Sequence, residues 1–151
     1  MSSTTQRMTQ GLPVEIIKLP NGQTGIRLTA DILYENTPIG PVLVPRGFVS
    51  DGCSMPRIAW RALGHPFDYA YLYEAILHDF FYRYQDVDRY TADRILYEML
   101  KGKVGLLRRK AIYRGLRLGG WVAWNANAKK AEAKPVTPEE DDGNVHRYSG
   151  D

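Results

Sequence analysis

Apolar and polar residues alternate along the first third of the chain, which is the pattern of half-buried β-strands. The pattern predicts strands at Val14–Lys18, from Ile26 to Tyr34, and at Val42–Val44. Turn-forming residues separate these segments, at Pro20–Gly22 and between Pro38 and Pro41. The connections are too short to hold helical crossovers, so we expect a small antiparallel sheet.

Beyond Asp51 the apolar residues recur at helical spacing instead. A short helix is expected over Pro56–Leu63, with Ser54 as its N-cap. The segment Tyr69–Tyr84 predicts a longer helix, because its apolar positions follow one face: Ala70, Tyr73, Ile76, Leu77, Phe80, Phe81 and Tyr84.

Two further helices complete the expected fold. Asp88 or Thr91 is predicted to cap the first of them, which ends near Gly102, and the second runs from Leu106 to Ala128. The sequence therefore predicts an α+β fold, with a small N-terminal antiparallel sheet packed on a C-terminal bundle of about four helices.

The last predicted helix carries small residues at every fourth position: Ala111, Gly115, Gly119 and Ala123. Such a stripe allows a neighbouring backbone to approach closely, and we expect it to pack against the aromatic helix Tyr69–Tyr84. A membrane-spanning role is not expected, because Arg114 and Arg117 interrupt the segment.

Length and composition favour one folded domain. The chain has 151 residues, of which 44% are hydrophobic and 25% charged. We expect a single domain over residues 11–128, a flexible N-terminus at 1–10, and a flexible acidic tail at 129–151 that orders on a partner.

No apolar run approaches the ~20 residues that span a bilayer, and no signal peptide is apparent. Cys53 is the single cysteine, which excludes an internal disulfide.

The net charge of +3 conceals an uneven distribution. Residues 139–151 carry five acidic side chains and one basic one, whereas residues 1–138 carry 19 basic and 12 acidic side chains. One stretch is basic throughout: Lys101, Lys103, Arg108, Arg109, Lys110, Arg114 and Arg117. This stretch is either a binding surface for an anionic partner such as nucleic acid, or the solvated face of a helix.

Four polar residues form the candidate site. Asp51 lies in a segment rich in proline and glycine, where it either takes part in a functional site or forms an Asx-turn. His78 and Asp79 are adjacent on the predicted aromatic helix, about 100° apart around its axis. Asp93, on the next helix, reaches the same region if the two helices pack antiparallel.

One imidazole and three carboxylates are compatible with several kinds of chemistry. They suit a divalent metal site for Mg, Mn, Fe or Zn, or a general base in which a carboxylate orients His78. A Cys53–His78 nucleophilic pair is a further alternative. We favour a buried hydrogen-bonded network that joins elements of the fold, and we expect no cofactor.

The motifs resemble a family of unknown function found mainly in tailed bacteriophages and prophages. They are the segment Val44–Arg57, then Leu77-His78-Asp79-Phe80-x-Tyr82, Ala92-Asp93 and Gly119-x-Trp121. The resemblance covers about residues 25–125, and the family usually has a small residue where this chain has Cys53. The match places the following residues in a signature network: Asp51, Ser54, Pro56, Arg57, His78, Asp79, Tyr82 and Asp93.

The resemblance implies a virion structural or assembly protein of the tail or connector. Its partners would be other virion subunits, and it would be made in the host cytoplasm before entering the tail region. One alternative is a metal-dependent hydrolase, acting for example on the cell wall, that uses Asp51, His78, Asp79 and Asp93. Another is a nucleic-acid or host-factor binder that uses the stretch Lys101–Arg117, with Tyr113 as a stacking group.

Overall fold

The computed structural model describes residues 11–51 and 69–133, which belong to two compact units. The first unit holds the strands, the second holds the helices, and each is considered separately below. The predicted helix at Pro56–Leu63 and its cap Ser54 lie outside the described residues, as do both ends of the chain.

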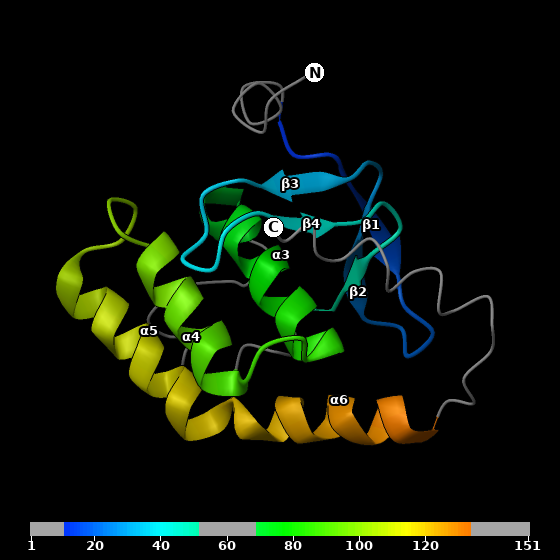
Figure 1. Ribbon diagram of the computed structural model, residues 1–151. Helices are drawn as coiled ribbons and strands as arrows, with labels where there is room; N and C mark the ends of the chain where they lie inside the picture. The colour runs from blue at the N-terminus through cyan, green and yellow to red at the C-terminus, as the bar shows by residue number, and fades with distance from the viewer. Residues whose placement is uncertain (1–10, 52–68, 134–151) are drawn as a thin grey trace. The chain divides into compact units, whose positions relative to one another are not determined.

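The first unit contains two small antiparallel sheets, drawn as blue and cyan arrows in Figure 1. One has the strand order β1-β2-β5, and the other pairs β3 with β4. The bounds are β1 Val14–Lys18, β2 Thr24–Leu28, β3 Ile32–Tyr34, β4 Val42–Val44 and β5 Val49–Ser50. The predicted strands at Val14–Lys18 and Val42–Val44 are confirmed, and β5 was not predicted.

The single strand predicted from Ile26 to Tyr34 is wrong, because the chain divides there into β2 and β3. After Leu28, the amide of Thr29 donates to the carbonyl of Pro13 at 2.7 Å. The side chain of Asp31 accepts a hydrogen bond from the amide of Arg46 at 2.7 Å. These contacts bend the chain between the two strands. The alternation still predicted the burial correctly, since the inward residues Ile26, Leu28, Ile32 and Tyr34 are all at most 3% exposed.

The second unit contains four helices within its described range: α3 Tyr69–Tyr84, α4 Arg89–Met99, α5 Leu106–Gly119 and α6 Trp121–Ala133. The helix predicted at Tyr69–Tyr84 is confirmed. Asp88 is the N-cap of α4, and its carboxylate accepts a hydrogen bond from the hydroxyl of Thr91. An α+β fold, with small antiparallel sheets followed by helices packed together, is therefore established. No helix in the described ranges is long and apolar enough to cross a bilayer.

Helix α3 packs against α4 and α6, and α4 packs against α5 (Figure 1). Helix α3 buries aromatic and aliphatic side chains, with Ile76, Leu77, Phe80 and Phe81 at most 1% exposed, together with the polar residues Glu74, His78 and Asp79. A second apolar cluster joins α4 to α5 through Leu96, Leu100, Val104, Ile112 and Leu116. Helix α4 therefore lies between α3 and α5 in the packing of this unit.

The single helix predicted from Leu106 to Ala128 is also wrong. It consists of α5 and α6, which leave Gly120 in different directions (Figure 1), and α6 continues to Ala133. The stripe of small residues is consequently divided. Gly115 is buried on α5, which packs on α4, whereas Ala111 is exposed. Of the two helices α6 has the main packing against α3, so the predicted packing of one continuous stripe against that helix does not occur.

Gly120, between α5 and α6, lies close to side-chain and backbone atoms of α3 and α5. A Cβ atom at Gly120 would lie 2.6 Å from the carbonyl oxygen of Leu116 and closer still to the hydroxyl of Tyr82 on α3. Neither contact is tolerable, and the carbonyl belongs to the backbone of α5. The absence of a side chain at Gly120 therefore allows Tyr82 to reach its position beneath the junction of the two helices.

We predict that Gly120→Ala lowers the free energy of unfolding by about 1–3 kcal/mol, the usual cost of overpacking. The measurement is urea denaturation followed by circular dichroism. Gly105→Ala is the matched control, because a Cβ there meets no described atom within 4 Å. The control should cost about 1 kcal/mol or less, as expected at an N-cap. Equal losses in both variants would contradict the close approach of Tyr82 to Gly120.

Candidate functional site

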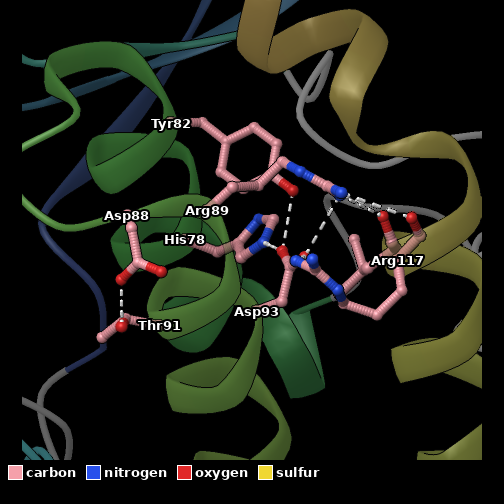
Figure 2. Close-up of polar contacts among 8 residues, drawn as sticks. His78, Tyr82, Asp88, Arg89, Thr91, Asp93 and Arg117 are labelled. Atoms are coloured by element: carbon pink, nitrogen blue, oxygen red, sulfur yellow. Dashed lines mark hydrogen bonds and ion pairs between the residues drawn. The ribbon is translucent and has the colours of Figure 1, made fainter.

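The candidate site is centred on the carboxylate of Asp93, which is 0% exposed. Three helices supply its neighbours, as Figure 2 shows. His78 and Tyr82 are one turn apart on α3 and therefore share a face, and Arg89 and Asp93 are one turn apart on α4. Arg117 approaches from the last turn of α5. Side chains from α3, α4 and α5 thus converge on one acidic group.

Both oxygens of Asp93 accept hydrogen bonds. Oδ1 lies 2.9 Å from Nε2 of His78 and 2.7 Å from the hydroxyl of Tyr82, which donates to it. Oδ2 accepts from Nη1 of Arg117 at 2.8 Å, and Nη1 of Arg89 lies 3.5 Å from it. A buried carboxylate is tolerated only when it is paired and hydrogen-bonded, and Asp93 has both kinds of partner.

Arg89 extends the network to the backbone of α5. Its Nη1 donates to the carbonyl oxygen of Leu116 at 3.0 Å, and its Nη2 lies 3.4 Å from the carbonyl oxygen of Arg117. The last carbonyl groups of a helix lack partners within the helix and carry the negative end of its dipole. Arg89 therefore caps the C-terminal end of α5 while it also faces Asp93.

The surroundings decide the charge of Asp93. Burial alone would raise the pKa of its carboxyl group, but hydrogen bonds from His78, Tyr82 and Arg117 together lower it below the ordinary value. Asp93 is therefore an anion at neutral pH. Burial and the negative charge of Asp93 raise the pKa of Tyr82 well above its usual range, so the phenol stays protonated and remains a donor.

Aromatic rings enclose these polar atoms. The rings of His78 and Tyr82 lie 4.3 Å apart between centroids, and Trp124 of α6 meets Tyr82 edge-on at 5.2 Å. The side chains of His78 and Asp93 are both 0% exposed. Gln85, just beyond the end of α3, donates to the carbonyl oxygen of Trp124 at 2.7 Å and attaches α6 to the same region. Solvent consequently has little access to the network.

The predicted proximity of His78 and Asp93 is confirmed, and Tyr82 of the signature network contacts the same carboxylate. Asp79 is also buried on α3, next to His78. Asp51 is exposed and lies in the first unit. The signature residues Ser54, Pro56 and Arg57, and with them Cys53 of the proposed nucleophilic pair, fall outside the described residues.

Sequence reasoning missed Arg89 and Gly120, and it placed Arg117 on the surface rather than in the network. The spacing of Arg89 and Asp93, four residues apart on one helix, was the available signal for the first. Among residues 11–51 and 69–133, no three His, Cys, Asp or Glu side chains form a group that could hold a metal ion.

The basic stretch does not form one exposed surface. Arg109 is buried, with its guanidinium 4.4 Å from the ring centroid of Tyr97. Lys101 pairs with Glu98 at 2.5 Å, and Lys103 pairs with the buried carboxylate of Glu74. Five of the seven are exposed: the paired Lys101 and Lys103 before α5, and Arg108, Lys110 and Arg114 along α5. The expected stacking group Tyr113 is half-buried, and its ring lies 5.4 Å from that of Tyr97.

The chain thus has an α+β fold whose helical unit is organised around a buried ion pair. By its sequence the chain belongs to the DUF1353 family, proteins of unknown function, whose model matches residues 26–116. The expected membership of a family of unknown function is thereby confirmed.

One relative of this chain is the uncharacterized protein y4jT of Sinorhizobium fredii (strain NBRC 101917 / NGR234). The two are 31% identical over 85 residues, which is 56% of this chain and 20% of that protein. This chain therefore covers about a fifth of the relative's length. No solved structure matches the chain.

The lowered pKa of Asp93 predicts how stability depends on pH. A carboxylate whose pKa is lower in the folded state stabilises the fold above its unfolded pKa, about 3.9. This contribution is lost as the pH falls through the folded pKa. We expect the free energy of unfolding, measured by urea titration from neutral pH to pH ~3, to decline at the acid end in the wild type. The decline should be much shallower in Asp93→Asn, which is also less stable at neutral pH.

Glu98→Gln is the control for this titration. Glu98 lies on the same helix, and its pKa is lowered mainly by a hydrogen bond from Lys101 at a partly exposed position. Because solvent screens such pairs, this variant should keep most of the wild-type acid decline. Parallel curves for the wild type and Asp93→Asn would contradict the assignment of Asp93 as a buried anion.

Proposed function

We propose that this chain is a structural or assembly protein of a tailed-phage virion, located in the tail or its connector. The enclosure of Asp93 is the observation that supports a structural role rather than a catalytic one. Its two oxygens, on α4, accept hydrogen bonds from side chains of α3 and α5, and the side chains of Asp93 and His78 are completely buried. The network holds helices together and offers no reacting atom to a substrate.

An enzyme that used these groups would have to present at least one of them to a substrate. In the general-base alternative the imidazole of His78 would have to reach the substrate, whereas its side chain is 0% exposed. The alternative of a metal-dependent hydrolase receives less support for the same reason, since the oxygens of Asp93 are already engaged. The contacts support a scaffold.

The nucleic-acid alternative receives less support from the basic residues. Arg109 and Arg117 are engaged within the helical unit, and Lys101 and Lys103 pair with acidic groups. Phosphate binding draws on several exposed cations that act together. The remaining exposed cations lie on α5 among large apolar side chains, an arrangement more typical of a protein interface.

The phage context is supported by the sequence signature, from Val44–Arg57 through His78-Asp79 to Asp93, which resembles proteins of tailed phages and prophages. Membership of the family does not itself supply an activity. The partners we propose are other virion subunits, with the C-terminal tail beyond α6 ordering on one of them. The protein would be made in the host cytoplasm and reside in the tail region after assembly.

The test is to purify phage particles produced by the bacterium that carries this gene and to analyse their proteins by mass spectrometry. We expect the chain in the particles at a fixed copy number relative to known tail subunits. Deletion of the gene should yield particles with defective or missing tails in electron micrographs, and the wild-type gene in trans should restore them. Absence of the chain from intact particles, with normal tails after deletion, would refute the proposal.

A further inference from the structure

The outer side of α5 and the start of α6 present large apolar side chains to solvent. Leu107 is 85% exposed and Leu118 is 70% exposed on α5, and Trp121 and Val122 of α6 are 53% and 58% exposed. Monomeric proteins rarely leave several large apolar groups exposed along one element unless a partner covers them. This face points away from the Asp93 network, which takes the inner side of α5 through Leu116 and Arg117.

The exposed residues follow a regular spacing. Steps of four, three, four, three and four residues connect the members of a set we call the outer seam: Leu107, Ala111, Arg114, Leu118, Trp121 and Asn125. Every member is exposed. Within α5, this is the alternation with which one helix meets another in a coiled coil. The part on α5, from Leu107 to Leu118, is long enough for three turns of a partner helix, and Trp121 follows at the bend.

Charge restricts the kind of partner. Arg114 lies in the middle of the outer seam, and Lys110 is exposed one turn before it. No Asp or Glu occurs between Glu98 and Glu132, so this chain supplies no nearby acid in sequence to balance Arg114. A partner that covers the apolar groups must also bring a carboxylate to the guanidinium, because an unpaired buried charge is costly.

We infer that the outer seam is the docking site for an acidic amphipathic helix of another virion protein. The partner's apolar side chains cover Leu107, Leu118 and Trp121, and one of its carboxylates pairs with Arg114. Trp and Arg are enriched at the centres of protein interfaces, which agrees with this composition. The inference deepens the proposed function and rests on it, since it names the surface through which an assembly protein meets its neighbour.

Two other occupants fit the outer seam less well. In a symmetric pair formed by two copies of this chain, Arg114 would face a second cationic seam, and like charges oppose each other. Binding to a membrane surface is opposed by Arg114, because its side chain projects from the apolar side of the helix. Arg114 lies within about 20° of Leu107 around the helix axis. Helices that lie on membranes carry their cations on the polar face, away from the apolar one.

The test uses the full-length chain with a photoreactive p-benzoylphenylalanine in place of Leu118, expressed while particles assemble. Irradiation followed by mass spectrometry identifies the peptide that is joined to position 118. We expect one partner peptide that combines heptad-spaced apolar residues with Asp or Glu. Ile16, an 80% exposed residue of the first unit, carries the same photoreactive group in the control and should not capture that peptide.

Charge variants give the decisive comparison. Arg114→Glu should reduce the yield of this cross-link by about tenfold or more, whereas Arg114→Lys should keep most of it. Both variants leave the fold intact, because Arg114 is exposed, and thermal unfolding provides the check. Cross-links to a second copy, to a peptide without acidic residues, or at equal yield in both variants would overturn the inference. Flotation of the purified chain with phosphatidylglycerol vesicles, lost in Leu118→Asp, would overturn it in favour of a membrane surface.

The same samples separate this inference from the proposed function. If the chain is present in purified particles but position 118 captures no acidic helix, the outer seam is wrongly assigned and the virion role stands. If the chain is absent from particles, the proposed function fails, and an acidic helix captured at position 118 would then belong to a partner outside the virion.

Discussion

The packing of the helical unit depends on one constraint: the buried carboxylate of Asp93 needs hydrogen-bond donors that replace water. Removing Asp93 from water costs several kcal/mol unless donors replace the lost hydration. These donors come from α3 and α5 to Asp93 on α4, so the positions of the three helices relative to one another are restricted by a few oxygen–donor distances. Gly120 belongs to the same constraint, because a side chain there would displace Tyr82. The bend between α5 and α6 therefore lies directly above the network.

This arrangement divides α5 into two sides with different roles. Its inner side contributes Ile112 and Leu116 to the apolar cluster with α4, and its last turn supplies Arg117 to Asp93. The outer seam is left to solvent, with exposed apolar side chains that the inner contacts do not need. A rigid inner side is useful to a protein that presents an outer surface to a partner, because little further ordering is required on binding. This division connects the buried network to the proposed role in assembly.

The sequence predicted the local patterns well and the long-range effects poorly. Alternation and helical spacing located β1, β4 and α3, and the antiparallel packing of α3 and α4 brought His78 to Asp93 as expected. The division of β2 from β3 depends on contacts with Pro13 and Arg46, which are distant in sequence. The adjacent glycines Gly119 and Gly120 are a local sign of a helix end, but they were interpreted as part of a stripe of small residues. Arg109 and Arg117 resembled their exposed neighbours, since charge alone does not reveal which side of a helix is buried.

The measurement that tests the account most directly is a double-mutant cycle between Tyr82→Phe on α3 and Arg117→Met on α5. Each substitution removes one donor to Asp93 and keeps most of the side-chain volume. If the carboxylate couples the two helices, the combined loss in free energy of unfolding should differ from the sum of the single losses by about 0.5–3 kcal/mol. The cycle of Tyr82→Phe with Arg94→Met, whose partner is Glu98, should be additive. Additivity within about 0.5 kcal/mol in both cycles would contradict a shared network centred on Asp93.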